Sequence, residues 1–229
     1  DLFNIMGCQF NSAQLVCGGL IACNLVIFGC WTRALRGGHD PLHYAYPWLQ
    51  KHFLHYAFSG RAFPMLGATF SHITFPHLLF NMLGLWSFGP ALVPLLGEEN
   101  FLACYLSSGV LSSFGGMLIR LATTATAPSL GASGSVLYLA SITALIYPAT
   151  QFTIIFFPFV SFPAPQVLMG IVALDITGLL MRWRRFDHGA HLAAVATGVT
   201  FVGWGADLIT KYQRWVILQW RKVRKQIRG

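Results

Sequence analysis

Two pairs of polar residues have the types and the spacing of an acyl-transfer site. Ser133 follows Gly131 and Ala132 at the start of one apolar stretch, and His191 opens a later apolar stretch. A serine hydroxyl is a weak nucleophile until a neighbouring base accepts its proton, and the imidazole of histidine is suited to that task near neutral pH. The second pair, His77 and Asn81, is spaced i, i+4 and therefore shares one helix face. Both of its side chains can donate hydrogen bonds to a developing oxyanion.

The residues around the serine and the histidine support this chemistry. The backbone N–H of Ser133 is a third candidate oxyanion donor, because an amide in the first turn has no partner within its own helix. His188 precedes the base by three residues, and we expect it to lie behind the site. Asp187 either orients His191 or caps its helix, so we expect a Ser–His dyad without Asp187 as a third member. Small residues would let the two helices approach closely in lipid: Gly131, Ala132, Gly134, Ala190, Ala193, Ala194 and Gly198.

Each of these features alone has an ordinary structural explanation. A Gly-Ala-Ser-Gly run in an apolar helix is commonly a packing motif, and a single histidine is commonly a hydrogen-bonded core residue. His77 and Asn81 alone would fit an interhelical hydrogen-bond pair. The site hypothesis rests on their convergence at one depth, which depends on the helices that carry them.

The composition places those helices in a membrane. The chain has 229 residues, of which 55% are hydrophobic and 10% are charged, with a mean hydropathy of +0.59. Soluble domains carry about 25% charged residues. We find no polar linker and no internal repeat, so we expect one membrane domain over residues 1–210 and a basic juxtamembrane tail over 211–229.

Hydropathy predicts an all-α integral membrane protein with six spanning helices. Spanning segments need about 20 mostly apolar residues, and six stretches qualify: 12–31, 76–96, 100–119, 131–147, 166–181 and 188–209. Alternating directions make the second, fourth and sixth helices start on the same side. His77, Asn81, Ser133 and His191 therefore fall at a similar depth on that side.

The connecting segments are less regular. Residues 32–75 combine aromatic and basic side chains, which favours a long loop at the headgroup level. Residues 152–162 are apolar but interrupted by prolines, so we expect them to lie in the interface or pack on the edge of the bundle. The five cysteines form no disulfide framework and no zinc motif. Four histidines have spacings that could bind a metal ion, but we favour exposed loop residues: His39, His43, His52 and His55.

Charge patterning gives hypotheses about partners. The formal net charge is +8, and seven Lys or Arg residues lie within residues 211–229. This tail is either simply solvated or attracted to anionic lipid, and no folded basic domain suggests nucleic acid. Basic residues are almost evenly divided between the two sides, so the orientation in the membrane stays open. Asp175 is an acid within the fifth helix, where a structural role is favoured over a catalytic one.

The motifs together resemble the rhomboid family. The likeness rests on Ser71-His72 with His77 and Asn81, on residues 131–134, and on Ala190-His191 with small residues at 194 and 198. Four stretches are similar to the mitochondrial, presenilin-associated branch: 85–88, 96–113, 128–134 and 186–192.

This resemblance implies a six-helix core with a water-filled active site inside the membrane. It implies that Ser133 is the nucleophile, that His191 is the base, and that His77, Asn81 and the Ser133 amide form the oxyanion hole. It implies single-pass membrane proteins as substrates, no metal or other cofactor, the mitochondrial inner membrane as the location, and a further helix upstream of Asp1.

Some positions depart from the family pattern, and two other functions compete. Many bacterial members have a tyrosine at the position of Leu137, a glycine at that of Ala194, and a Trp-Arg pair in the first loop, for which Arg61 is the nearest counterpart. An inactive rhomboid-like protein that escorts membrane clients is the main alternative, although the serine and the histidine are both present. A transporter or channel is less favoured, because Asp175 alone offers a charge at mid-depth.

Overall fold

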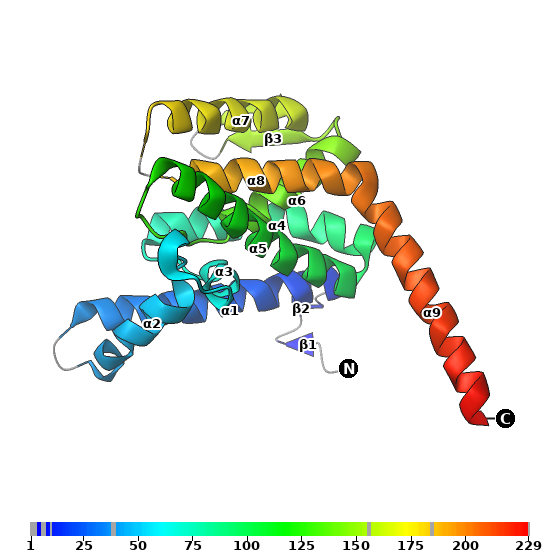
Figure 1. Cartoon of the computed structure of the whole chain (residues 1–229). Coiled ribbons are helices and arrows are strands. Elements are labelled where there is room, and N and C mark those ends of the chain that lie inside the picture. The colour runs from blue at the N-terminus through cyan, green and yellow to red at the C-terminus, as the bar shows by residue number, and fades with distance from the viewer. Residues whose placement is uncertain are drawn as a thin grey trace.

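The computed structural model describes residues 4–5, 8–9, 11–37, 40–154, 157–183 and 186–228. This part of the chain is mostly helical (Figure 1). All six segments predicted as spanning helices are helical: α1 (Ser12–Arg36), α4 (Phe75–Leu96), α5 (Glu98–Thr123), α6 (Ser133–Ile146), α7 (Ala164–Leu180) and α8 (His188–Thr200). By length and composition, α1, α4, α5 and the continuous helix from His188 to Arg224 are able to cross a membrane, whereas α6 and α7 are shorter apolar helices.

Helix α6 is the centre of the bundle. It contacts α4, α5, α7 and α8, and most of its side chains are buried. It ends at Ile146 because Pro148 follows closely and disfavours helical backbone in the residue before it. Large apolar side chains of α4, α5 and α6 form the core around it: Leu85, Leu92, Phe101, Tyr105, Leu139 and Ile142.

Small residues allow α6 and α8 to approach closely, as the sequence predicted, and also bring α5 against them. A Cβ atom on Gly134 would lie 2.2 Å from Ser112 Oγ, and one on Gly198 would lie 2.7 Å from the Cβ of Ser141. At the same interface Ser112 Oγ donates a hydrogen bond of 2.9 Å to the carbonyl of Ala190. These contacts bring the first turns of α6 and α8 together.

The described part of the segment predicted as a long loop, residues 32–37 and 40–75, contains several short helices. Helix α1 continues to Arg36, and four short elements follow: η1 (Pro41–Ala45), α2 (Tyr46–Phe53), η2 (Ala57–Ser59) and α3 (Phe63–Ala68). A small apolar cluster of Trp31, Ala34, Leu49 and Leu54 holds this segment against the end of α1. The short helices were not predicted, because local hydropathy does not show which apolar side chains find a partner, and the place of this segment at the headgroup level stays a prediction.

The loop histidines divide into different environments. His43 is exposed as predicted, His52 is half-buried, and His39 lies outside the described residues. His55 is buried, with 1% of its surface exposed, so the prediction of an exposed side chain was wrong for it. Its backbone pairs with that of Ser129 in an isolated antiparallel bridge. Over the described residues, no three His, Cys, Asp or Glu side chains group as a metal site.

Two short β hairpins qualify the all-α prediction. Strands β1 (Asn4–Ile5) and β2 (Cys8–Gln9) precede α1, and β3 (Gln151–Ile154) pairs antiparallel with β4 (Phe157–Pro163). Prolines exclude a helix over the second hairpin, whereas edge strands tolerate them. The hairpin packs at the edge of the bundle, where the ring of Phe152 lies 5.1 Å from that of Phe88 in α4.

The predicted basic tail is helical. A π-helical turn, η3 (Phe201–Gly205), links α8 to α9 (Ala206–Arg228). Figure 1 shows α9 turning away from the axis of α8 and leaving the bundle. The chain therefore has a compact helical core and one helix that extends beyond it.

We predict that Gly198→Ala destabilises the bundle by about 1–3 kcal/mol, because the added methyl group overpacks the α6–α8 contact. Gly170→Ala in α7 is the matched control, since nothing lies within 4 Å of its Cβ position. Thermal unfolding of the detergent-purified proteins measures both. Equal stability of the two variants would contradict the close approach of α6 and α8.

Candidate active site

The structure brings the predicted nucleophile and base into contact. Ser133 is the first residue of α6, and His191 lies in the first turn of α8. His191 Nε2 lies 3.0 Å from Ser133 Oγ, which is hydrogen-bond distance. Both side chains are partly buried, so the pair is sheltered and still reachable.

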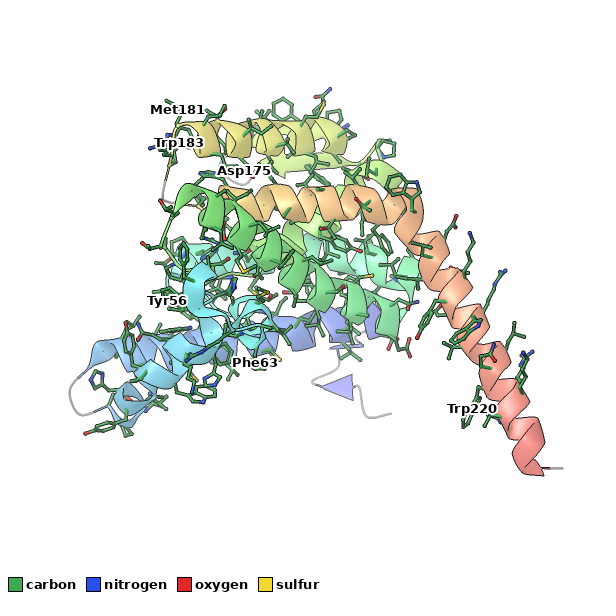
Figure 2. The ribbon with its side chains drawn as sticks, in the orientation of Figure 1. Tyr56, Phe63, Asp175, Met181, Trp183 and Trp220 are labelled. Carbon is green, nitrogen blue, oxygen red and sulfur yellow. The ribbon has the colours of Figure 1, made fainter. Side chains whose placement is uncertain are left out.

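A carboxylate faces the other side of the base, which the sequence reasoning did not predict. Asp175 Oδ1 in α7 lies 3.2 Å from His191 Nδ1. The Asp175 side chain is 4% exposed, and Figure 2 shows it between α7 and α8. The sequence predicted a Ser–His dyad without Asp187 as a third member and favoured a structural role for Asp175, so the contact of Asp175 with His191 was not expected. An acid within an apolar helix was the available signal, but the sequence could not show which helix this acid faces.

His188 shares the same carboxylate oxygen. Its Nδ1 lies 2.6 Å from Asp175 Oδ1, and the residue is 3% exposed. Gly178 makes room for the ring, because a Cβ there would lie 2.3 Å from His188 Nε2. His188 is thus enclosed between α7 and α8 beside the base, and its supporting role stays a prediction.

Asp187 caps α8 and does not contact the imidazole of His191. Its Oδ1 accepts a 3.2 Å hydrogen bond from the Ala190 amide, and its Oδ2 accepts one of 2.6 Å from Ser129 Oγ. Oδ2 also forms an ion pair with Arg120 at the end of α5. Of the two predicted roles for Asp187, the structure shows the cap, which joins α5, α8 and the segment before α6.

The segment that leads into Ser133 enters the bundle with its backbone hydrogen-bonded. The Gly131 amide donates to the Ala68 carbonyl at 2.8 Å, and the Ala132 amide donates to His72 Nε2 at 3.2 Å. Burial, assisted by the neighbouring His77, lowers the pKa of His72 to about 3. His72 is therefore neutral at physiological pH, which leaves its Nε2 free to accept. The sequence reasoning used His72 only as part of the resemblance and gave it no role.

The predicted oxyanion donors His77 and Asn81 differ in what they contact near residues 129–132. Gly131 has φ +114°, and a Cβ there would lie 2.6 Å from His77 Cε1, so glycine allows the ring to touch the backbone. The His77 and His72 rings are 4.8 Å apart. Asn81 is buried, and its Nδ2 donates to the His77 carbonyl at 2.8 Å. The oxyanion roles of His77, Asn81 and the Ser133 amide stay predictions.

Leu137, at the position of the tyrosine in many bacterial members, and the neighbouring Tyr138 both pack against apolar side chains. Leu137 packs with apolar residues of α7 and α8. Tyr138 is buried and its ring lies edge-on to Phe201 at 5.7 Å.

Ser133 and His191 thus contact each other at the starts of α6 and α8, two packed apolar helices. The Rhomboid domain family model matches residues 59–206, a span that includes all of these residues. The chain belongs to the rhomboid family. It is 36% identical over 224 residues to "Presenilin-associated rhomboid-like protein A, mitochondrial" of Danio rerio, a match that covers 96% of this chain and 55% of the relative.

Two further relatives agree with this branch. The human "Presenilin-associated rhomboid-like protein, mitochondrial" is 35% identical over 94% of this chain and 55% of its own length. "Rhomboid protein 1, mitochondrial" of Saccharomyces cerevisiae is 33% identical over 85% of this chain and 54% of its own. The rhomboid chain described here thus spans about half the length of the curated relatives it matches. All three are named mitochondrial, in agreement with the prediction of an integral mitochondrial membrane protein.

Proposed function

We propose that this rhomboid chain carries the catalytic core of an intramembrane serine protease. The observation that supports this most directly is the 3.0 Å contact between Ser133 Oγ and His191 Nε2. The inactive, client-escorting alternative is weaker, because a chain that only binds clients has no need of a serine and a histidine in this geometry. The small residues that bring α6 and α8 together serve the same contact.

The hydrogen bonds suggest how the serine is activated. A His191 that donates its Nδ1 proton to Asp175 keeps the Nε2 lone pair directed at Ser133. Oγ attacks the carbonyl carbon of the scissile peptide while its proton passes to Nε2. The protonated histidine then gives that proton to the leaving amine, and water hydrolyses the acyl-enzyme by the same proton transfers in reverse order.

The developing oxyanion needs donors on the opposite side of the carbonyl. The Ser133 amide lies in the first turn of α6, and His77 lies beside Gly131 immediately before it. We propose these two groups and Asn81 as the oxyanion hole. Each such donor is worth roughly 2.7–4 kcal/mol in the transition state.

We also propose a six-helix membrane core, with α6 and α7 as the two short spans. Helix α6, with 14 residues, is about 21 Å long and begins below the membrane surface. This depth puts Ser133 within reach of a single-pass transmembrane substrate. A helical substrate has its backbone groups paired, so we expect cleavage where helix-weakening residues let the strand unwind. The relatives are named mitochondrial, and we propose the mitochondrial inner membrane as the location.

We expect a fluorophosphonate probe to label the purified protein at Ser133. Ser133→Ala and His191→Ala should abolish labelling, because the first removes the nucleophile and the second removes its base. Ser107→Ala on the exposed face of α5 is the control and should label normally. A folded wild-type protein that is not labelled would favour the non-proteolytic function.

His77→Ala should lower the rate of substrate cleavage by about 10²–10³, with little change in stability, if its ring donates to the oxyanion. His43→Ala, in the exposed part of the α1–α2 connection, is the matched histidine control. Cleavage of a model transmembrane substrate in detergent gives both rates. Wild-type turnover by His77→Ala would rule out its oxyanion role.

Asp175→Asn should reduce turnover by about 10²–10⁴, because an amide in place of the carboxylate no longer fixes the productive tautomer of His191. Asp207→Asn in α9 is the control for the loss of one carboxylate away from the site. Measuring kcat and thermal stability together separates a positioning role from unfolding. An unchanged kcat would show that the histidine acts without the acid.

A further inference from the structure

Helix α9 presents an apolar face that the described chain does not cover. Six large side chains on this face are exposed, with 41–65% of their surface accessible. They recur at the spacing i, i+4, i+7, i+8, i+12 and i+15, which places them along one side of a helix: Leu208, Tyr212, Trp215, Val216, Trp220 and Val223. Figure 2 shows Trp220 on the part of α9 that extends beyond the bundle. The face needs a partner, because it would otherwise leave aromatic and aliphatic surface in water.

The opposite face of α9 is strongly basic. Seven Lys or Arg residues and one acid, Asp207, lie within Ala206–Arg228. Among the side chains that the structure describes, the helical register puts Arg214 and Arg221 opposite the apolar face. Lys211, Lys222 and Arg224 lie toward its two borders, and the exposed Ile217 and Leu218 lie among these cations. Through residue 224, where side chains are described, none of these cations is paired with a carboxylate. The Arg224 guanidinium lies over the Trp220 ring at 5.7 Å, at the border between the two faces.

The length of the helix that precedes α9 indicates at which depth in the membrane α9 begins. From His188 to Gly205 the preceding helix rises about 27 Å at 1.5 Å per residue, close to the thickness of the hydrocarbon core. Helix α9 therefore begins near the bilayer boundary on the side opposite to Ser133. Figure 1 shows that it turns away from the α8 axis there instead of continuing along it.

We propose that α9 is an interfacial helix that binds the anionic phospholipid surface on the side of the membrane opposite to the active site. Its apolar face lies at the acyl boundary, where Tyr and Trp rings are favoured, and its basic face contacts phosphate-bearing headgroups. A second copy of α9 is a poorer occupant, because pairing two such helices brings two cationic surfaces close together. This proposal concerns a surface remote from Ser133 and His191 and does not depend on catalysis.

The test uses the full chain in proteoliposomes of phosphatidylcholine, alone or mixed with cardiolipin. A nitroxide is placed at Val223→Cys on the apolar face or at Arg221→Cys on the basic face, with the native cysteines replaced by alanine. The collision rate of the nitroxide with oxygen measures its contact with lipid, and its collision rate with a water-soluble nickel chelate measures its contact with water. Val26→Cys, on the exposed surface of α1, is the reference for a lipid-facing side chain.

With cardiolipin we expect position 223 to be accessible to oxygen and protected from nickel, like position 26, and position 221 to be accessible to nickel. In phosphatidylcholine alone, the difference in nickel accessibility between positions 221 and 223 should be smaller. Lys222→Gln with Arg224→Gln should reduce it in the mixed bilayer, since each charge near an anionic surface changes partitioning by roughly fivefold. The control of equal charge, Arg36→Gln with Arg61→Gln, alters exposed residues outside α9 and should leave it unchanged.

Two results would overturn the proposal. Nickel access at both positions in the cardiolipin bilayer would mean that α9 extends freely into water. Position 223 could instead be protected from nickel equally in both bilayers, and more strongly at a higher protein-to-lipid ratio. That result would mean that a second copy covers the apolar face. Fluorophosphonate labelling at Ser133 in the same samples shows whether the site is intact, so failure of this proposal is distinguished from failure of the proposed function.

Discussion

The structure depends on hydrogen-bonding the irregular backbone that enters the bundle before Ser133. A buried amide or carbonyl without a partner is costly where water is absent, so non-helical backbone at depth is tolerated only inside protein or along a water-filled cavity. Here Ser129 pairs with His55, Gly131 with Ala68, and Ala132 with His72. These partners come from the segment between α1 and α4. That segment, which hydropathy alone describes as a loop, is therefore a required part of the site.

At the same end of the bundle, a partly buried ion pair joins otherwise separate elements. Asp187 caps α8, accepts from Ser129 Oγ and pairs with Arg120 of α5. A buried carboxylate is stable when hydrogen bonds and a cation compensate its desolvation. Because one residue contacts both the α8 start and the segment before α6, it couples the positions of the histidine and the serine. Close packing of small residues in α5, α6 and α8 completes that coupling.

The imidazole of His191 is contacted on one side by Ser133 and on the other by Asp175. The residue at the family's tyrosine position is Leu137, and the neighbouring Tyr138 packs into the core instead. Asp175 contacts the base from α7, and His188 contacts the same carboxylate oxygen. An acid in an apolar helix requires hydrogen-bond partners, and both histidine rings lie at hydrogen-bond distance from its Oδ1. Helix α7, on the periphery of the bundle, thereby becomes part of the site.

The sequence alone determined the membrane character, the six helical segments and the identity of the Ser133–His191 pair. These follow from apolar length, from direction reversal along the chain and from small residues beside each polar group, all of which are local properties. The fold of residues 32–75, the burial of His55, the β3–β4 hairpin and the contact of Asp175 with His191 were decided by the tertiary structure. Each depends on which distant side chain or backbone group lies opposite. One-dimensional periodicity gives the face of a helix but does not give the neighbour that this face meets.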